Sequence, residues 1–578
     1  MKRFVFVFGW FACCALQTVG EEKPVSDIGR QIANFRLPSC HGDVVSLADF
    51  KDKKAIVVVF TGTACPLNNQ FMPVLVKLYH EFAARGVQFL AINANAQDSL
   101  SDVARHAKEF KIPFPVLKDA GNKVADVFRA ERTPEAFLLD ASHRLRYRGR
   151  ISDQFGIGYA RPQPKHDFLA DAINQLLAGE KVTTPITQPE GCLIGREIAT
   201  KKTGRITYAR QIARILQENC QECHRPGQIG PMPLLTYQDA VAWSGTIREV
   251  VMQKRMPPWY ADPRFGSFAN DRRLSKKEID LLLEWIDSGL AEGDPKDLPP
   301  PKKFDPGWRL GKPDLIVAMP KAFSVPAKMP AGGVPYQYFH VDPGFKEDRW
   351  VIRAEAKAGA PSVVHHVLVF IVPPGERFFP GNPKTPALGG TAPGDMPLIL
   401  PSGVAKKIPA GSKLVFQMHY TPNGTPAKDR SSIGLTFAKK PPRYEAQTVP
   451  IYTLRFRIPP GADNHRVEAS FRFDKNGHLL NFMPHMHLRG KDFRYVAIYP
   501  DGKKETLLFV PRYDFNWQSV YRLARPLPVP KGTIIQCIAH YDNSANNPNN
   551  PDPTRAVYWG DQTWQEMMIG WLDFYYDE

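Results

Sequence analysis

Cysteine is scarce in this protein, with 8 residues among 578. From residue 312 to the end the only cysteine is Cys537, which excludes an internal disulfide framework for that long stretch. Cys220 and Cys223 form a close pair, and no second pair lies nearby to complete a four-cysteine zinc site. The few cysteines therefore point to individual sites rather than to a disulfide scaffold.

The chain also lacks a hydrophobic run long enough to cross a bilayer. Phe4–Leu16 is apolar but short, follows a positively charged start and precedes small and polar residues, which predicts a signal peptide over residues 1–20. Cys13 and Cys14 raise the alternative of a lipoprotein, but the residues before them make a poor lipid-attachment box. We therefore expect a periplasmic or secreted protein without a transmembrane segment or a lipid anchor.

Positive charge is plentiful but nowhere concentrated. The formal net charge is +17, but the lysines and arginines are not clustered in any block of the sequence. The sequence therefore does not indicate a nucleic-acid partner. A hydrophobic content of 43% and a charged content of 23% are typical of folded domains, and the length requires several of them.

The sequence Cys220-Gln221-Glu222-Cys223-His224 is the most specific motif in the chain. Two cysteines separated by two residues and followed by histidine are typical of covalent haem c attachment, with the histidine as an axial iron ligand. A zinc knuckle or a structural disulfide is the alternative, which the missing second cysteine pair disfavours.

Helical patterns surround this motif. Residues 208–217 have helical periodicity, and residues 274–286 begin with an N-cap signal at Ser275 and stop at Gly289. We predict an all-α domain over 205–293, and its layout resembles a small cytochrome c. Because c-type haems are attached outside the bacterial cytoplasm, this resemblance agrees with export.

A methionine is expected to face His224 across the haem. Met256 lies in a proline-rich loop between the two predicted helices, and thioether ligation would raise the iron potential for electron transfer. Met252 or Met232 is the alternative ligand, with Met256 packed in the core.

The N-terminal region, 27–177, has an α/β pattern. Apolar runs over 55–60, 87–93 and 136–140 predict buried strands, and 70–84 predicts a helix.

Cys65 follows the first of these strands, and Thr133-Pro134 precedes the third. This arrangement resembles the thioredoxin-like redoxin family, in which the proline is cis and faces the cysteine. Asn68 stands where a thioredoxin has its second cysteine, and Gly62 stands where a peroxiredoxin has threonine. Cys65 can still be reactive at a helix N-terminus, with Cys40 or Cys192 as a distant resolving partner; a redoxin fold kept only for docking is equally open.

Two linkers divide the rest of the chain. The polar stretch 178–204 and the proline-rich stretch 299–303 both read as connections between domains. Beyond them, short alternating strands with frequent proline and glycine predict an all-β region of two tandem jelly-roll sandwiches, over 312–445 and 446–578.

Nine of the fifteen histidines lie in this all-β region, and five of them form three compact motifs. His365 and His366 are neighbours in a predicted strand, so both can bind one ion only at a bulge or a strand end. His419 precedes a tyrosine, and His485 and His487 are spaced to lie on one face of a strand.

This histidine pattern resembles the copper type II, ascorbate-dependent monooxygenases, the family of the peptidylglycine hydroxylating and dopamine β-monooxygenases. The resemblance implies two coppers, one in each sandwich. One would be held by His365, His366 and His419. The other would be held by His485, His487 and Met567, with Met568 as the adjacent competitor.

The resemblance further implies a reaction in which dioxygen binds at the second copper, an activated C–H bond is hydroxylated there, and the first copper supplies an electron. The family positions that hold a peptide carboxylate fall near Met483, Ile569 and Trp571, which disfavours peptide amidation. We expect an exported oxidoreductase in which the haem relays electrons from an external donor to a dicopper monooxygenase acting on an organic substrate. The alternatives are a non-catalytic copper-binding or electron-transfer protein, and a thiol peroxidase or reductase centred on Cys65.

Overall fold

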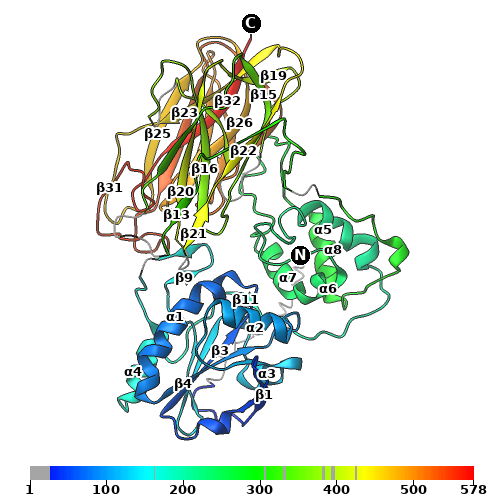
Figure 1. Cartoon of the computed structure of the whole chain (residues 1–578), viewed down its shortest axis with the longest axis vertical. Helices are drawn as coiled ribbons and strands as arrows, with labels where there is room; N and C mark the ends of the chain where they lie inside the picture. The colour runs from blue at the N-terminus through cyan, green and yellow to red at the C-terminus, as the bar shows by residue number, and fades with distance from the viewer. Residues whose placement is uncertain are drawn as a thin grey trace, which may run out of the picture.

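The computed structural model describes residues 27–577 except 162, 305–306, 328–329, 331–333, 380–383, 392–396 and 423–425. The predicted signal peptide, with Cys13 and Cys14, lies outside the described residues. Figure 1 shows an α/β domain in blue, a helical domain in green and a large all-β region running from green to red. None of the helices in the described part of the chain has the length and apolar character that crossing a bilayer requires.

The α/β domain is built on a five-stranded sheet with the order β5-β4-β3-β7-β8. All seven residues of β3 are buried, because hydrophobic clusters cover both faces of the sheet. The strands are β3 (Ala55–Thr61), β4 (Val87–Asn93), β5 (Val116–Lys118), β7 (Glu135–Asp140) and β8 (Leu145–Gly149). The helices are α1 (Pro66–Phe82), α2 (Leu100–Glu109), α3 (Lys123–Phe128) and α4 (Phe168–Leu177). The thioredoxin-like α/β architecture predicted for this region is confirmed.

Two details of this domain differ from expectation. Helix α1 begins at Pro66 and not at residue 70, because Cys65 caps its N-terminus and proline suits the first helical position. The stretch predicted as a linker also contributes to the domain. Its strand β11 (Cys192–Leu193) pairs with β6 (Arg132–Thr133), immediately before Pro134.

The helical domain contains four α-helices and one π-helical turn among the described residues. The π-helical turn η4 (Tyr208–Ile212) continues directly into α5 (Ala213–Asn219), which ends at Cys220. The others are α6 (Tyr237–Ala242), α7 (Ser244–Met252) and α8 (Lys276–Asp287). Ser275 caps α8 with a full capping box, as predicted. Trp285 is the fully buried centre of the core of this domain.

The all-β region consists of two sandwiches that share one nine-stranded sheet. The N-terminal sandwich contributes β12 (Leu315–Ala318), β22 (Ser432–Phe437), β15 (Arg349–Lys357), β18 (Leu398–Ile399) and β19 (Val404–Ile408). The C-terminal sandwich contributes β23 (Tyr444–Tyr452), β32 (Ile569–Tyr576), β26 (Gly477–His485) and β29 (Tyr521–Val529). A short parallel pairing of β19 with β23 joins the two halves.

Each half packs a four-stranded sheet against its part of the shared sheet. In the N-terminal sandwich this sheet is β14 (Gln337–Val341), β20 (Lys413–Tyr420), β16 (Val364–Val372) and β17 (Ala387–Thr391). In the C-terminal sandwich it is β25 (His465–Arg472), β30 (Ile534–Tyr541), β27 (Gly490–Ile498) and β28 (Lys504–Val510). The predicted large all-β region is therefore confirmed.

The segment between α7 and α8 packs on the C-terminal sandwich. Trp259 and Phe268 belong to the core of that sandwich and contact Tyr521 edge-on, with ring centroids 4.9 and 5.6 Å away. The Asn270 side chain donates a hydrogen bond to the Val520 carbonyl at 2.7 Å. The helical domain is thus tied to the all-β region by buried contacts.

Candidate functional site

Cys65 lies at the junction of strand β3 and helix α1, with its thiol almost completely buried at 1% exposure. Its Sγ accepts a hydrogen bond from the backbone N–H of Asn68 at 3.5 Å, the usual position of a side chain that caps a helix. The Thr133 carbonyl lies 2.9 Å from the same sulfur, and the Thr133-Pro134 peptide is cis, as expected. Asn68, which replaces a thioredoxin's second cysteine, is itself fully buried.

Cys192 lies beside Cys65, close enough for each thiol to shift the pKa of the other. The pairing of β11 with β6 sets Cys192 opposite Thr133, the residue whose carbonyl contacts Cys65. Gly191 permits this close approach, because a Cβ there would lie 2.1 Å from the Thr133 carbonyl oxygen. Of the two distant partners considered, Cys192 is the one brought to Cys65.

The pKa values of the two thiols are shifted in opposite directions. Burial alone would raise the pKa of Cys65, but interactions with the Cys192 thiol, with backbone N–H groups and with the Thr133 side chain outweigh it and lower the pKa to about 6. The interaction with Cys65 and burial raise the pKa of Cys192 well above its ordinary value. Of the two thiols, Cys65 therefore ionises at the lower pH, which is the property of a nucleophilic cysteine.

The helical domain covers this thiol pair. Cys192 packs against the core of the helical domain as well as that of the α/β domain. Arg132 donates to the Gly191 carbonyl at 2.8 Å and forms an ion pair with Glu249 of α7 at 2.9 Å. Arg255 approaches the same carboxylate at 2.7 Å. These side chains fix the helical domain against the segment that carries Cys192.

The predicted haem residues lie together at the end of α5. Cys220 and Cys223 are free thiols, and the Nδ1 atom of His224 lies 3.1 Å from the Met232 carbonyl. With that Nδ1–H donated to a carbonyl, Nε2 is left as the ligating nitrogen, the orientation typical of a metal-bound histidine. Burial lowers the pKa of His224, which favours the neutral, ligating form. These residues fit the haem predicted from the motif.

The three methionines considered as the sixth ligand differ in their surroundings. Met252 is 54% exposed, and its sulfur accepts a hydrogen bond from Arg248. Met232 packs on the core of the helical domain and gives its carbonyl to His224. Met256 is half-buried and follows α7, with a cis peptide to Pro257. These surroundings leave Met256 as the best candidate.

His365, His366 and His419 form a compact buried cluster, with one nitrogen of each lying within 4.8 Å of the others. A register shift between β16 and β20 falls between Val364 and His366, so the bulge that adjacent ligands require is present. The Nδ1 atoms of His365 and His366 are 3.3 Å apart. That is the spacing of two nitrogen ligands each about 2.0 Å from one ion at a near-tetrahedral angle.

Several ring nitrogens of this cluster have no hydrogen-bond partner among the described residues: His365 Nε2, His366 Nε2 and His419 Nδ1. Burial lowers the pKa of His365 to about 4 and that of His419 to about 3, and His485 of the other sandwich adds repulsion to both. Neutral imidazoles are the form that binds a metal ion, so the cluster fits copper.

His485 and His487 have their rings 5.3 Å apart and hold defined orientations. The Nδ1 atom of His485 lies 2.7 Å from the Gln518 side-chain oxygen, and that of His487 lies 3.2 Å from the Gln565 carbonyl. Both Nε2 atoms are thereby left for a metal. The expectation that both lie within a strand is wrong, because β26 ends at His485.

Glu566 explains that strand end. Its carboxylate accepts the backbone N–H of His487 at 2.8 Å and that of Arg489 at 2.7 Å, in place of strand partners. Burial raises the pKa of Glu566 to about 8 despite these bonds. The neighbouring Met568 is fully buried in the core of the C-terminal sandwich, which leaves Met567 as the candidate thioether ligand.

The two histidine sets meet at Phe515. The Phe515 ring stacks on His365 with centroids 4.8 Å apart, and it contacts His487 edge-on at 6.0 Å. The preceding Asp514 accepts a hydrogen bond from Tyr260, and the following Asn516 donates one to the Gly158 carbonyl of the α/β domain. One loop of the C-terminal sandwich therefore contacts both histidine sets and both other domains.

Sequence reasoning missed four of these residues: Glu249, Phe515, Gln518 and Glu566. Only Glu566 could have been found from the sequence, because it directly precedes the proposed ligand Met567. The others lie on a helix of another domain or in an irregular loop, where no spacing pattern marks them.

Comparison with known proteins finds relatives of the α/β domain. The AhpC/TSA family model matches residues 28–148. The thiol-disulfide oxidoreductase ResA of Bacillus thuringiensis subsp. konkukian is 31% identical over 125 residues, which are 22% of this chain and 69% of that protein. ResA of Halalkalibacterium halodurans is 29% identical over 119 residues, 21% of this chain and 66% of that protein. The chain thus spans about two thirds of the length of these relatives.

Among solved structures, the hypothetical protein SMc02350 from Sinorhizobium meliloti is 32% identical, with a TM-score of 0.28. The match covers 30% of this chain and 96% of the chain of that protein. Peroxidoxin BcpB from Mycobacterium tuberculosis is 18% identical, with a TM-score of 0.21, and the match covers 26% of this chain and 94% of the chain of that protein. Cys65 lies inside the segment matched by the family model, and Cys192 lies outside it.

Proposed function

Residues 28–148 make this chain a member of the AhpC/TSA family, and from that membership we propose that it is an exported thiol-disulfide oxidoreductase whose nucleophile is Cys65 and whose resolving thiol is Cys192. The observation that carries the proposal is the juxtaposition of these two cysteines: the pairing of β11 with β6 sets Cys192 opposite Thr133, whose carbonyl lies 2.9 Å from the Cys65 sulfur. The ResA relatives are named for this same activity. An oxidising compartment outside the cytoplasm suits a redox-active cysteine pair.

The reaction proceeds by two exchanges. The Cys65 thiolate attacks a substrate disulfide, which forms a mixed disulfide and releases one substrate sulfur as a thiol. The Cys192 sulfur then attacks Cys65, the second substrate thiol leaves, and a Cys65–Cys192 disulfide remains. Two electrons pass from the protein to the substrate, and an external dithiol returns them.

The proton affinities suit this order of events. Cys192 keeps its proton while the Cys65 thiolate lies beside it, because that interaction is the largest cause of its raised pKa. Once Cys65 is consumed in the mixed disulfide, this cause is removed and Cys192 becomes easier to deprotonate. The resolving step is thereby held back until the first exchange is complete.

Peptide mapping tests the assignment of the pair. The full-length protein is treated with a mild thiol oxidant, digested without reduction and analysed by mass spectrometry. We expect a linked peptide containing Cys65 and Cys192. A link from Cys65 to Cys40, or a Cys65 that stays reduced under conditions that oxidise small dithiols, would contradict the assignment.

A second function is favoured by a separate observation, the buried His365, His366 and His419 cluster with unsatisfied ring nitrogens. We infer that the all-β region is a dicopper monooxygenase that hydroxylates an activated C–H bond of an organic substrate. Its second ligand set is His485, His487 and Met567. Copper bound in these positions supplies one-electron redox chemistry with dioxygen.

Residues around the histidines hold them in orientations that suit metal binding. The Gln518 oxygen and the Gln565 carbonyl hold the rings of His485 and His487 in one tautomer. Glu566 fixes the backbone from His487 to Arg489 by accepting the N–H groups of these two residues. Phe515 stacks on His365 and contacts His487 edge-on, so its ring touches both sets.

In this second function, Cys220, Cys223, His224 and Met256 of the helical domain would hold a haem c, which would supply one-electron transfer. The support is the hydrogen bond from His224 to the Met232 carbonyl, which leaves Nε2 available for iron. The buried packing of Trp259 against Tyr521 holds the segment that follows Met256 on the C-terminal sandwich. An external donor would deliver electrons to this domain.

Metal analysis and oxygen uptake test the second function together. We expect two coppers and one covalent haem per chain, and dioxygen consumption that requires a reductant. His366→Ala should remove one copper, whereas His340→Ala, at an exposed position on the neighbouring strand β14, should remove none. A purified protein that binds no copper would contradict the proposal.

A further inference from the structure

A short hairpin of the α/β domain lies between the thiol pair and the all-β region. Its strands are β9 (Phe155–Gly156) and β10 (Tyr159–Ala160), which pair with each other. Figure 1 shows β9 at the end of the α/β domain that faces the all-β region. Neither proposed function uses this hairpin, although hydrogen bonds run from it in both directions.

On the thiol side, the hairpin is bound by Glu190, which lies two residues before Cys192. One carboxylate oxygen of Glu190 accepts the backbone N–H of Ile157 at 2.9 Å, and the other accepts an N–H of Arg150 at 2.7 Å. Arg150 also donates to the Phe155 carbonyl at 3.2 Å. The segment that carries Cys192 is therefore joined to the hairpin at two points.

On the other side, the hairpin contacts the C-terminal sandwich. The carbonyl of Gly158, at the tip of the hairpin, accepts a hydrogen bond from the Asn516 side chain at 3.1 Å. Arg161, directly after the hairpin, donates to the Pro548 carbonyl at 3.2 Å. The first of these contacts holds the middle of the loop 514–518.

This loop touches one histidine of each set. The Phe515 ring stacks on His365, and the side-chain oxygen of Gln518 lies 2.7 Å from Nδ1 of His485. The Gln518 amide also donates to the Phe515 carbonyl at 3.2 Å. A displacement of Phe515 is therefore felt at both histidine rings.

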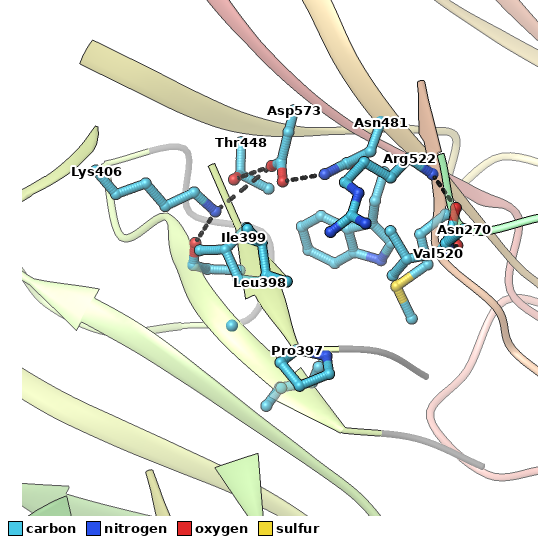
Figure 2. Close-up of a pocket in the computed structure, with 16 residues that line it drawn as sticks. Asn270, Pro397, Leu398, Ile399, Lys406, Thr448, Asn481, Val520, Arg522 and Asp573 are labelled. Atoms are coloured by element: carbon cyan, nitrogen blue, oxygen red, sulfur yellow. Dashed lines mark hydrogen bonds and ion pairs between the residues drawn. The ribbon is translucent and has the colours of Figure 1, made fainter. Parts of the chain in front are cut away.

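Both ends of the loop are fixed by the segment between α7 and α8. The Tyr260 hydroxyl donates to the Asp514 carboxylate at 3.3 Å. Just beyond the loop, the Asn270 side chain donates to the Val520 carbonyl at 2.7 Å and accepts the backbone N–H of Arg522 at 3.0 Å, as Figure 2 shows. With its ends held in this way, the loop responds to movement of the hairpin at its middle.

Oxidation of the thiol pair must displace one of the two sulfur atoms, because a covalent bond brings them closer than any non-bonded contact. Cys65 caps a helix of 17 residues that packs on the core of the α/β domain. Cys192 lies on a strand that is paired over two residues. The segment of Cys192 is thus the part that yields, and Glu190 moves with it.

We propose that oxidation of Cys65 and Cys192 is transmitted through the β9–β10 hairpin to the loop 514–518, where it shifts Phe515 against His365. In the oxidation, the two thiols lose two protons and two electrons, and a substrate disulfide takes them up and leaves as two thiols. The switch rests on the proposed thiol function for this oxidant. It requires no bound metal.

The structure is that of the dithiol form, because Cys65 and Cys192 are both free. In this form the rings of Phe515 and His365 are stacked, with their planes 13° from parallel. Displacement of the loop in the disulfide form weakens this stack and uncovers one face of the His365 ring. A proposed copper ligand thereby responds to the supply of the external dithiol that reduces the thiol pair.

Hydrogen–deuterium exchange of the full-length protein tests the switch. The protein is compared before and after treatment with excess hydroxyethyl disulfide, and peptides covering 514–518 are followed by mass spectrometry. The backbone N–H groups of Asn516 and Trp517 are bonded to Asp514, so they report a disturbance of the loop. We expect them to exchange at least about threefold faster in the disulfide form, the effect of losing one exposed hydrogen bond. Equal or slower exchange would overturn the proposal.

Two asparagine variants of the same sandwich test the route. Asn516→Ala removes the bond to Gly158 and keeps the backbone N–H, so exchange in the loop should no longer depend on the thiol state. Asn464→Ala, at an exposed position before β25, should keep the full response. A response that persists in Asn516→Ala would overturn the route through the hairpin.

Peptide mapping of the same samples separates the switch from the thiol function. If no disulfide between Cys65 and Cys192 forms, both are overturned. If the disulfide forms and the loop does not respond, the switch alone fails. Cys192→Ala cannot form the disulfide and should show the same slow exchange with and without the oxidant; a response in this variant would overturn the dependence on the thiol pair.

Discussion

Cys192 lies beside Cys65 and the two thiols shift each other's pKa, although Cys65 caps helix α1 and Cys192 lies on strand β11, beyond the segment matched by the redoxin family model. A thioredoxin places its second cysteine on the same helix, and here Asn68 occupies that position. The two-residue pairing of β11 with β6 brings Cys192 to the same sulfur from the other side of Pro134. The dithiol is thus assembled from two distant parts of the chain.

Removal of the resolving thiol should trap the first exchange product. In Cys192→Ser, the mixed disulfide formed at Cys65 has no neighbouring thiol to release it, so we expect it to persist. Incubation with a disulfide-containing peptide, followed by intact-mass spectrometry, detects the added mass. The matched variant Cys40→Ser keeps Cys192 and should show no accumulation; accumulation in both variants would argue against Cys192 as the resolving thiol.

The Cys65 thiolate should form near pH 6. Because hydrogen bonds lower the pKa of Cys65 to about 6, the thiol is protonated below that pH and ionised above it. The ultraviolet absorbance of the thiolate, taken as the difference between wild type and Cys65→Ser, should rise through this range. Cys192→Ala removes the interaction that lowers the pKa of Cys65 most, so its midpoint should move to higher pH. A midpoint near the ordinary thiol value in the wild type would contradict this account.

The contact between the α/β and helical domains should protect Cys192. Arg132 and Glu249 form a largely buried ion pair, with side-chain exposures of 18% and 16%. Glu249→Gln leaves Arg132 without its counter-charge and should cost about 1–3 kcal/mol, less than the cost of breaking a fully buried pair. Alkylation of Cys192 should also become faster.

Glu284→Gln provides the control for that change. The Arg205–Glu284 pair is exposed, at 78% and 41%, so its loss should cost less than about 1 kcal/mol. Thermal unfolding and alkylation rates compare the two variants. Equal effects of both substitutions would show that the domain contact does not depend on Glu249.

Gln518 should act on copper binding through His485. Its side-chain oxygen lies 2.7 Å from Nδ1 of that histidine and sets the tautomer. Gln518→Leu removes this acceptor and should weaken one copper site by about 10–100-fold, with the His366 site unchanged. Competition with a copper chelator measures the two affinities. Gln536→Leu, which loses only an exposed contact with Glu468, is the control and should change neither.

Met256 should set the potential of the haem. A thioether ligand raises the reduction potential, so Met256→Ala should lower it. Met252→Ala removes an exposed side chain that bonds only Arg248 among the described residues, and should leave the potential unchanged. Optical redox titration distinguishes them. A fall in Met252→Ala with none in Met256→Ala would reverse the ligand assignment.

The local features of the fold were predictable because they depend on neighbouring residues. The apolar run 55–60 of β3 is buried on both faces, the Ser275 capping box starts α8, and the adjacent histidines at 365 and 366 lie at the bulge that joint ligation requires. Each of these follows from periodicity or from a single steric rule applied to a short stretch.

The features that were missed depend on distant pairing. The strand that carries Cys192 is two residues long and pairs with a partner far away in the sequence, and the parallel contact of β19 with β23 that joins the sandwiches is equally short. No periodicity signals pairs of that length. Phe515 and Gln518 lie in an irregular loop, where only the tertiary structure brings them to the histidines.

Disulfide turnover tests the central claim most directly. Full-length protein is assayed for reduction of an insulin-type disulfide with a dithiol as the electron source, alongside Cys65→Ser and Cys192→Ser. The account predicts turnover by the wild type, loss to the uncatalysed rate in Cys65→Ser, and a single exchange without turnover in Cys192→Ser. A Cys65→Ser variant as active as the wild type would contradict it.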